Sequence, residues 1–146
     1  MIHLNNYGWN DKLSQLKQES IYNALTHGRI SIVHRTCYEV VSENGLFQCE
    51  LTGNMMYGKS DLELPCTGDW VLFQPFDEHK GIIVDMLPRE RTLYRKKNGT
   101  VADKQAIASY VDKAFIVQSL DDNFNVRRAE RFMVQMQEEN INPVLV

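Results

Sequence analysis

Hydrophobic and polar residues follow two different periods in the amino-terminal part of the chain. From Asn10 to about Leu25 apolar residues recur at helical spacing, and Asn10 or Asp11 is a suitable N-cap. This spacing predicts a short helix before the main body of the protein. Gly28 ends that segment, and the chain then continues as runs of five to eight residues rich in β-branched and aromatic side chains. Runs of this kind predict strands.

The strand-like runs lie close together and indicate a small barrel. In the third run Phe47, Cys49 and Leu51 alternate with polar residues, as in a sheet with one face in water. Closing such a sheet on itself removes its exposed edges. The strands are expected at residues 29–35, 38–42, 46–51, 69–73 and 81–87, with turns at 43–45 and 75–80.

The carboxyl-terminal part has a different pattern. Residues 114–117 are a continuous apolar run, typical of a strand covered on both faces. Asn125 is a suitable N-cap for a following helix with one apolar stripe, and Asn142-Pro143 ends that helix before the apolar residues 144–146. Strand, helix and strand predict a βαβ unit, which needs further strands to bury its faces. We therefore expect the chain to stop inside an α/β domain.

Composition and charge restrict the possible classes of protein. An apolar fraction of 43% and a charged fraction of 24% are typical of a folded domain. No basic region leads into an apolar stretch at the start, and no apolar run is long enough for a membrane span, so a cytoplasmic protein without membrane contact is expected. The formal charge of −3 excludes nucleic-acid binding by bulk positive charge, so any RNA site must be local.

The cysteines and histidines do not form a recognisable site in the sequence. Cys37, Cys49 and Cys66 are odd in number and lack C-x-x-C spacing, which argues against a disulfide framework and a zinc ribbon and favours a reducing compartment. The four histidines are scattered, and no pair has the spacing of a metal site. We expect no metal site and no catalytic residue in this chain.

Residues Gly53 to Ser60 match the phosphate-loop pattern G-x-x-x-x-G-K-[ST]. A working loop leads into a helix whose amino terminus faces the phosphates. Pro65 leaves room for a single helical turn after Ser60, because proline lacks a donor and clashes with the preceding turn. The D-x-x-G and N-K-x-D motifs that hold magnesium and guanine do not occur in the sequence. We therefore interpret the match as a loop between barrel strands, with Lys59 exposed and no bound nucleotide.

A basic segment follows the last barrel strand and is the candidate RNA site. Five of the sixteen lysines and arginines fall within nine positions that contain one acid, Glu90, and Leu93 and Tyr94 lie among them. Cations beside an aromatic ring suit phosphate contact and base stacking. The alternative is a solvated strand edge on which charge blocks aggregation. The RNA-binding residues expected here are Arg89, Arg91, Tyr94, Arg95, Lys96 and Lys97.

Other basic residues are weaker candidates for RNA contact. Arg29 and Arg35 belong to the first predicted barrel strand, and Lys59 lies in the loop after the third. Three further arginines, at positions 127, 128 and 131, have the spacing of an exposed helix face, and Glu130 among them favours simple solvation.

Several separate blocks of the sequence together resemble the RsgA (YjeQ) family, and the resemblance runs from about Gly28 to Val146. In chain order the blocks are Gly28-Arg29, Gly68-Asp69-Trp70-Val71, Leu87-Pro88-Arg89, Arg95-Lys96, Gln105-Ala106-Ile107-Ala108, Val111-Asp112 and Asn125-Val126-Arg127-Arg128-Ala129-Glu130-Arg131. One departure is Tyr110, which stands where the family usually has asparagine. The segment before Gly28 lies outside this resemblance.

The resemblance implies a fold and a domain order. Members of the family have an amino-terminal OB-fold, then a circularly permuted GTPase domain in which N-K-x-D precedes the phosphate loop, and then a small zinc-binding domain. The expected fold class is mainly β, a five-stranded OB-fold barrel followed by the first strand, helix and strand of an α/β P-loop-type GTPase domain. The expected parts are a helical extension (1–27), an OB-fold RNA-binding domain (28–98) and a linker with the truncated start of the GTPase domain (99–146), which stops just before N-K-x-D.

The resemblance also implies a function for the full-length protein. It is expected to hydrolyse GTP late in maturation of the small ribosomal subunit, with GTP or GDP, magnesium and a structural zinc held outside this chain. Its expected partners are the small subunit and its rRNA, which the OB-fold binds, and it is expected to be a monomer. The alternative is a free-standing OB-fold protein that binds single-stranded RNA or DNA without enzymatic activity.

Overall fold

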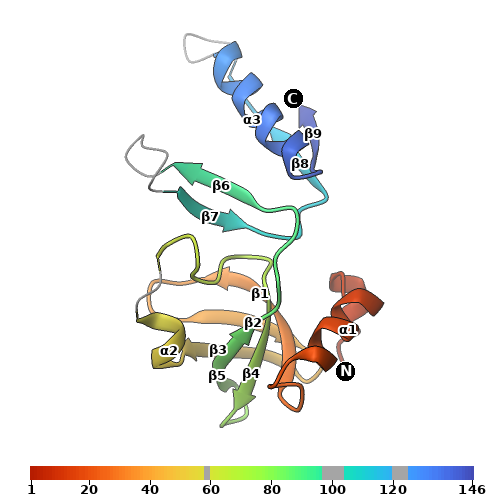
Figure 1. Cartoon of the computed structure of the whole chain (residues 1–146), viewed down its shortest axis with the longest axis vertical. Helices are drawn as coiled ribbons and strands as arrows, with labels where there is room; N and C mark the ends of the chain where they lie inside the picture. The colour runs from red at the N-terminus through yellow and green to blue at the C-terminus, as the bar shows by residue number, and fades with distance from the viewer. Residues whose placement is uncertain (58–59, 97–103, 120–124) are drawn as a thin grey trace.

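The computed structural model describes residues 1–57, 60–96, 104–119 and 125–146. Figure 1 shows three tiers along the longest axis of the molecule: a barrel, a two-stranded hairpin, and a small unit built around one helix. The amino-terminal segment lies beside the barrel, and the carboxyl terminus lies in the helical unit at the opposite end. The chain is therefore an elongated arrangement of a barrel and an α/β unit with a hairpin between them.

The barrel contains five strands whose order is that of an OB-fold. Neighbours around the closed barrel are β1-β2-β3-β5-β4, and every pairing is antiparallel except that of β3 with β5. Its strands are β1 (Thr26–Val33), β2 (Tyr38–Ser42), β3 (Gly45–Leu51), β4 (Trp70–Pro75) and β5 (Lys80–Met86). The five strands expected from the alternating pattern are confirmed, with ends that differ by up to three residues.

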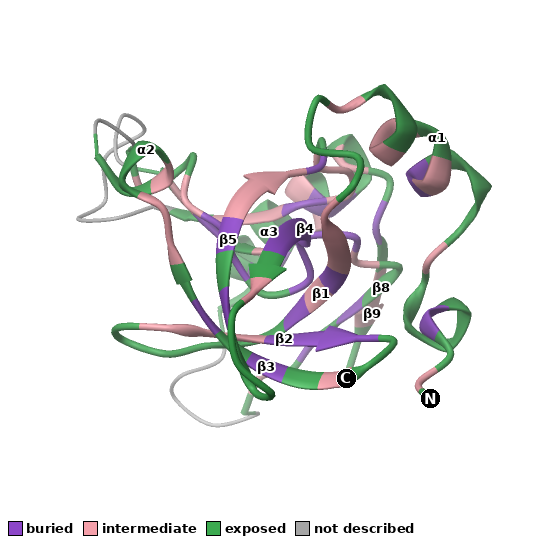
Figure 2. Cartoon of the chain, turned by 90° about the horizontal axis from the view of Figure 1, so that it is seen from below, coloured by how far each residue is buried: buried purple, intermediate pink, exposed green. Residues whose placement is uncertain are grey.

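The barrel core arises from alternation along the strands, and Figure 2 shows buried segments on all five of them. Phe47 and Cys49 point inward from β3, while Gln48 between them and Glu50 after them are exposed. Gly28 lies inside β1 instead of ending the segment before it, which corrects the sequence expectation. A Cβ atom there would lie 2.7 Å from the Val41 carbonyl oxygen, so only glycine allows this close approach. The remaining core members are Ile30, Val40, Val71, Phe73 and Ile83.

The amino-terminal segment forms a 3-10 turn, Leu4–Tyr7, and one helix, α1 (Asp11–Glu19). Asn10 is the N-cap, and its side chain accepts a hydrogen bond from Leu13 N at 3.0 Å. The helix is shorter than the predicted span, which reached about residue 25. Ser20 ends it in an extended conformation, and its hydroxyl accepts a hydrogen bond from the Tyr22 amide. A serine in this position favours a turn because its side chain competes for the backbone donors.

The hairpin and the α/β unit follow the barrel. Strands β6 (Leu93–Lys96) and β7 (Lys104–Ala108) pair antiparallel, and β8 (Lys113–Ile116) pairs parallel with β9 (Asn142–Leu145). The helix α3 (Val126–Glu138) packs on β8 and β9, and Asn125 caps it as predicted. The βαβ unit is thus confirmed, whereas the sequence did not predict the β6–β7 hairpin. Among the described residues, no helix is both long and apolar enough to cross a membrane.

His27 holds the amino-terminal segment on the barrel through two contacts. Its ring stacks on Trp9 with 4.0 Å between centroids, and its Nδ1 atom lies 2.9 Å from the Lys17 ammonium. Burial lowers the pKa of His27, and the positive charge of Lys17 lowers it further. The folded protein therefore favours the neutral imidazole at this position.

We expect this contact to make the stability of the domain depend on pH. A histidine whose folded-state pKa is lowered binds more protons in the unfolded chain, so its contribution is complete above pH 6.5 and is lost as the pH falls through the lower folded-state value. Urea midpoints should therefore fall between about pH 7.5 and about pH 5. The His27→Gln variant, which cannot titrate, should lose less over the same interval. An equal loss in both proteins would contradict the prediction.

Candidate nucleic-acid interface

The basic segment predicted to bind RNA is split between the hairpin and the turn that leads into it. Arg95 lies on β6 with an exposed side chain, and its guanidinium donates to Gln105 Oε1 on β7 at 3.1 Å. Tyr94 is half-buried, and the Lys104 ammonium lies over its ring at 5.8 Å from the centroid. Each strand of the hairpin therefore carries an exposed cation, and Lys104 lies over a tyrosine ring, which combines charge with an aromatic surface as phosphate and base contact requires.

Lys104 was missed in the sequence because it lies outside the basic segment and joins it only through strand pairing. In the register of the hairpin Lys96 pairs with Lys104, so β7 brings a cation to the basic strand. The side chain of Lys96 and the whole of Lys97 lie outside the described residues, as does Lys59. The Asn98-Gly99 pair, typical of a hairpin turn, was the signal that a returning strand follows.

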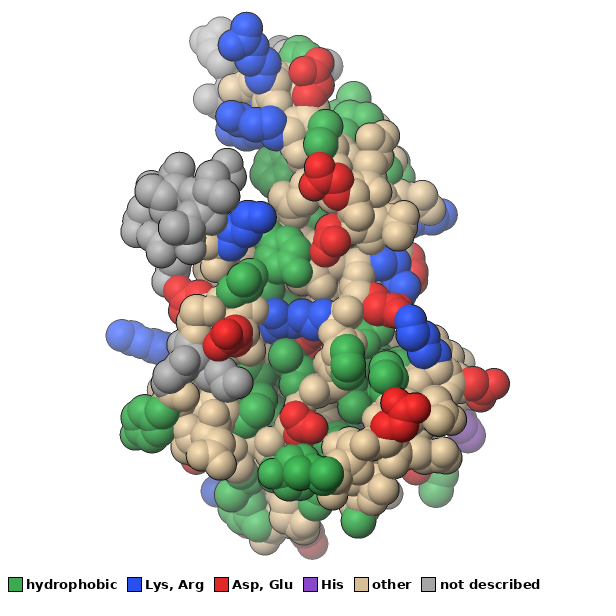
Figure 3. Space-filling model, viewed as in Figure 1, with side chains coloured by type: hydrophobic (Ala, Val, Ile, Leu, Met, Phe, Trp, Pro, Cys, Tyr) green, Lys and Arg blue, Asp and Glu red, His purple; other side chains and the backbone are tan. Residues whose placement is uncertain are grey.

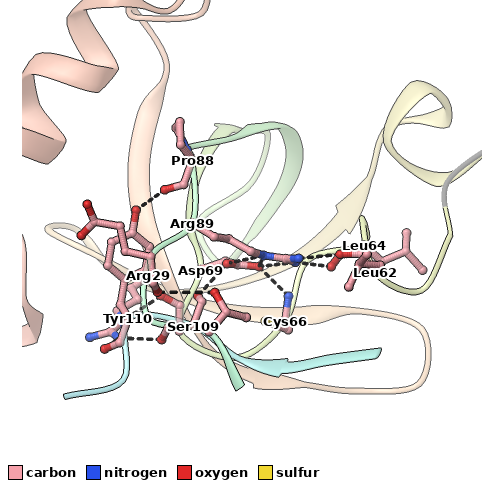
Figure 4. A network of polar contacts seen from close by, with 12 residues as sticks. Arg29, Leu62, Leu64, Cys66, Asp69, Pro88, Arg89, Ser109 and Tyr110 are labelled. Carbon is pink, nitrogen blue, oxygen red and sulfur yellow. Dashed lines mark hydrogen bonds and ion pairs between the residues drawn. The ribbon is translucent and has the colours of Figure 1, made fainter. Parts of the chain in front are cut away.

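Arg89 uses its guanidinium inside the protein, as Figure 4 shows. It donates to both carboxylate oxygens of Asp69, with Nη2 at 2.9 Å from Oδ2, and also to the backbone carbonyl oxygens of Leu62 and Leu64. The Asp69 side chain is fully buried, and only 13% of the Arg89 side chain is exposed. Because these bonds occupy all three nitrogens of the guanidinium, Arg89 is placed to hold the loop that contains Leu62 and Leu64 against the barrel.

Asp69 receives hydrogen bonds from two further groups. The Ser109 hydroxyl donates to Oδ1 at 2.6 Å, and the Cys66 amide donates to Oδ2 at 2.7 Å. Ser109 follows β7, so the carboxylate joins the barrel to the end of the hairpin. Burial raises the pKa of the Cys66 thiol to about 12, and the nearby Asp69 raises it as well. The thiol is therefore protonated and unreactive at neutral pH.

Arg29 has a similar structural role beside the connection between the barrel and the hairpin, residues 87–92 and 109–112, which we call the junction. Its guanidinium donates to the carbonyl oxygens of Tyr7, Gly68, Ser109 and Tyr110, at distances from 2.6 to 3.3 Å. Arg35, in contrast, is exposed in the turn between β1 and β2. Of these two arginines only Arg35 presents its charge to solvent.

Tyr110 and Arg91 complete the junction. Tyr110 has a left-handed backbone with φ of 55°, and its hydroxyl donates to the Pro88 carbonyl oxygen. The Arg91 guanidinium lies over the Tyr110 ring at 5.8 Å and pairs with Glu90 and Asp112. Burial raises the pKa of Tyr110 to about 12, and Glu90 adds to the shift. Arg91 is thus half-buried and paired with acids, unlike the exposed Arg95.

A cleft of about 490 Å³ opens at this junction between the amino-terminal segment, the barrel and β8. Its wall includes Tyr7, Arg29, Thr67, Tyr110, Asp112 and Lys113.

Within the described part of the chain no group of three or more His, Cys, Asp or Glu side chains is arranged to hold a metal ion. The Cys49 thiol is buried in the barrel, and burial, followed by the influence of Cys37, raises its pKa to about 12.

The phosphate-loop match lies between β3 and β4, as expected from the sequence. Its first four residues form the single-turn helix α2 (Gly53–Met56), capped by Thr52. In a phosphate loop the helix follows the glycine-rich turn. Here one helical turn lies at the start of the match, and after Ser60 the chain makes a single further turn, in which the Glu63 and Leu64 amides donate to the Ser60 carbonyl oxygen.

Charge is unevenly distributed over the face drawn in Figure 3. Basic side chains occur at successive heights, from the helical unit past the hairpin to the middle of the molecule, and acidic side chains lie beside them. The lower barrel shows more hydrophobic and fewer basic side chains on this face. This face therefore carries a mixture of both charges and is not uniformly basic.

The amino-acid sequence matches one family over most of its length. The chain is 71% identical to the "Small ribosomal subunit biogenesis GTPase RsgA 1" of Bacteroides thetaiotaomicron over 99% of its own residues. This chain belongs to the RsgA family. A family model described as "RsgA GTPase" matches residues 86–146, and an RsgA protein of Oceanobacillus iheyensis is 33% identical over 81% of the chain. The chain spans 41% and 34% of the lengths of these two relatives.

Solved structures show the same fold. The circularly permuted GTPase YloQ superposes with a TM-score of 0.55 at 21% identity, covering 87% of this chain and 42% of that one. YjeQ from Thermotoga maritima superposes with a TM-score of 0.56 at 19% identity, covering 82% of this chain and 40% of that one. The Bacteroides match also includes most of the segment before Gly28, so that relative shares the amino-terminal extension.

We expect the Asp69 carboxylate to be essential for folding stability. In Asp69→Ala the Arg89 guanidinium loses its buried counter-ion, and removing one partner of such a pair costs about 3–5 kcal/mol of the free energy of unfolding. Ser109→Ala removes a single hydrogen bond and should cost about 1 kcal/mol. Urea unfolding followed by tryptophan fluorescence measures both.

A matched control is Glu90→Ala, which breaks ion pairs at the surface of the molecule. Exposed pairs contribute about 0–1 kcal/mol, so this variant should unfold near the parent midpoint. A loss in Asp69→Ala no larger than that of Glu90→Ala would show that the buried network is dispensable.

Proposed function

We propose that this chain is the amino-terminal part of a GTPase that acts in small ribosomal subunit biogenesis. The observation that carries the proposal is the 71% identity with the Bacteroides relative of that name, extending over nearly the whole chain. In this proposal the full-length protein hydrolyses GTP with magnesium late in maturation of the subunit, and a separate zinc-binding domain lies outside the residues described here. The family assignment gives no support to a free-standing OB-fold protein without enzymatic activity.

The proposed task of this part is to anchor the enzyme on rRNA. Two observations support the hairpin as the contact surface: the exposed side chain of Arg95, and the Lys104 ammonium over the Tyr94 ring. Lys96 and Lys97 remain part of the proposed site on the strength of the sequence. Arg35 is a further exposed candidate on the barrel.

Arg29, Arg89 and Arg91 have a different place in the proposal. Their guanidinium groups bond to carbonyl oxygens or acids within the protein, so an RNA phosphate would have to displace those partners. We infer that these three arginines hold the junction, and with it the hairpin, on the barrel. The proposed RNA surface is therefore centred on the hairpin and is narrower than the basic segment.

We expect reversal of the hairpin charges to weaken RNA binding. Arg95→Glu combined with Lys104→Glu removes two cations that face solvent on neighbouring strands. Each phosphate contact releases counterions, so the slope of log affinity against log salt should fall by about two, and affinity for a single-stranded rRNA fragment by at least about tenfold. Fluorescence anisotropy at several salt concentrations measures both quantities.

The matched control places the same charge change on α3, in Arg127→Glu combined with Arg131→Glu. Both side chains are exposed, so the net charge of the protein changes equally without altering the hairpin. This control should bind the fragment nearly as tightly as the parent. Equal weakening by the two double variants would assign the binding to overall charge instead of the hairpin.

The chain by itself should not bind guanine nucleotides. After its phosphate-loop match the chain makes a single turn before Pro65 where a phosphate loop leads into a longer helix, and the sequence contains no N-K-x-D to recognise guanine. Titration with a fluorescent GTP analogue should therefore give no saturable signal at micromolar protein. Saturable binding that disappeared in Lys59→Ala would instead identify residues 53–60 as a working phosphate loop.

A further inference from the structure

The amino-terminal segment contacts the barrel and also the residues that connect it to the α/β unit. The Lys12 ammonium pairs with Glu90, which lies after the last barrel strand. The Tyr7 carbonyl oxygen accepts a hydrogen bond from Arg29 Nη1 at 2.6 Å, and Nη2 of the same guanidinium donates to the Ser109 and Tyr110 carbonyl oxygens. Arg29 therefore joins three separate parts of the chain.

A buried apolar cluster connects the same three parts. Leu4 and Leu13 come from the amino-terminal segment, and Leu87 and Tyr110 come from the residues on either side of the hairpin. Trp70 of the barrel lies among them, and Trp9 packs against its ring edge-on with 5.0 Å between centroids. The full cluster is Leu4, Leu13, Val41, Trp70, Leu72, Leu87 and Tyr110. This cluster is distinct from the one that fills the barrel.

The α/β unit has its own core. In the part of the chain that the structure describes, this core contains residues of α3 and β8, Ile141 just before β9, and residues of the adjoining hairpin and connection, but none from the barrel strands. The direction in which the unit leaves the barrel therefore depends on the junction, residues 87–92 and 109–112.

We propose that residues 1–25 act as an interdomain brace: by completing the cluster around Trp70 and Tyr110 they hold the junction against the barrel and set the orientation of the α/β unit. The brace acts through packing and through the shared Arg29 bonds. Loosening it should leave the inner barrel folded, because the barrel is filled by a separate cluster.

Hydrogen exchange of the 146-residue chain tests the brace by measuring individual amides by NMR. Two reporters lie in the junction: the Tyr110 amide donates to the Glu90 carbonyl oxygen at 2.8 Å, and the Val111 amide to that of Arg91 at 3.1 Å. The test variant is Leu13→Ala, which opens a cavity in the cluster shared with the junction. Ile21→Ala is the matched control, because Ile21 lies in the same segment and is 88% exposed.

In Leu13→Ala the two junction amides should exchange with solvent at least about tenfold faster. The weakened cluster opposes local opening of the junction less strongly. Amides of the β2–β3 and β8–β9 pairs should change by less than about twofold, and Ile21→Ala should behave as the parent. Deletion of residues 1–24 should give the same pattern with a larger change. Unchanged junction amides in the deletion would overturn the proposal, as would equal acceleration throughout the barrel or loss of the barrel fold in both variants.

A second experiment uses the full-length protein and rests on the proposed function. Leu13→Ala should reduce the stimulation of GTP hydrolysis by small ribosomal subunits several-fold and leave the intrinsic rate unchanged, because Leu13 packs in the cluster around Trp70 and belongs to no nucleotide-binding motif. If the full-length parent itself is not stimulated, the proposed function fails, and hydrogen exchange alone decides on the brace. Full stimulation in a variant with accelerated junction exchange would show that the brace does not serve the enzyme.

Discussion

The buried Asp69 carboxylate is the interaction on which the arrangement of this chain depends. Three segments of the chain donate hydrogen bonds to it. Arg89 donates through Nε and Nη2, Ser109 through its hydroxyl, and Cys66 through its backbone amide. A fully buried charge is tolerated only when it is paired and hydrogen-bonded. Meeting that requirement fixes the loop after α2, the end of β5 and the end of the hairpin in one place.

This requirement explains why the basic segment divides into two groups. Positions near the barrel use their charge to satisfy acids and carbonyl oxygens, as Arg89 and Arg91 do, whereas Arg95 and Lys104 on the hairpin face solvent. The contacts of Arg89 and Arg91 hold the hairpin, and with it the exposed cations, on the barrel. Cations held in this way lose less conformational entropy on binding than cations on a free loop. The arginines with a structural role thus directly precede the hairpin that carries the proposed RNA-binding residues.

Much of the fold could be predicted from local sequence patterns, because alternation and capping act over a few residues. Phe47 and Cys49 show the barrel strand, and Asn125 shows where α3 begins. The hairpin could not be recognised in this way, since Lys104–Ala108 has few β-branched residues and becomes a strand by pairing with β6. The use of Arg89 was equally hidden, because an arginine that meets a buried aspartate twenty positions away looks the same in sequence as one in solvent.

The left-handed backbone of Tyr110 limits which residue types fit at that position. A φ of 55° costs conformational energy for most side chains and less for asparagine, the residue that the resemblance leads us to expect here. Tyrosine compensates through the Pro88 hydrogen bond and the Arg91 contact. The turn at this position therefore selects for residues that tolerate a positive φ, and here the tyrosine side chain also ties the turn to Pro88 and Arg91.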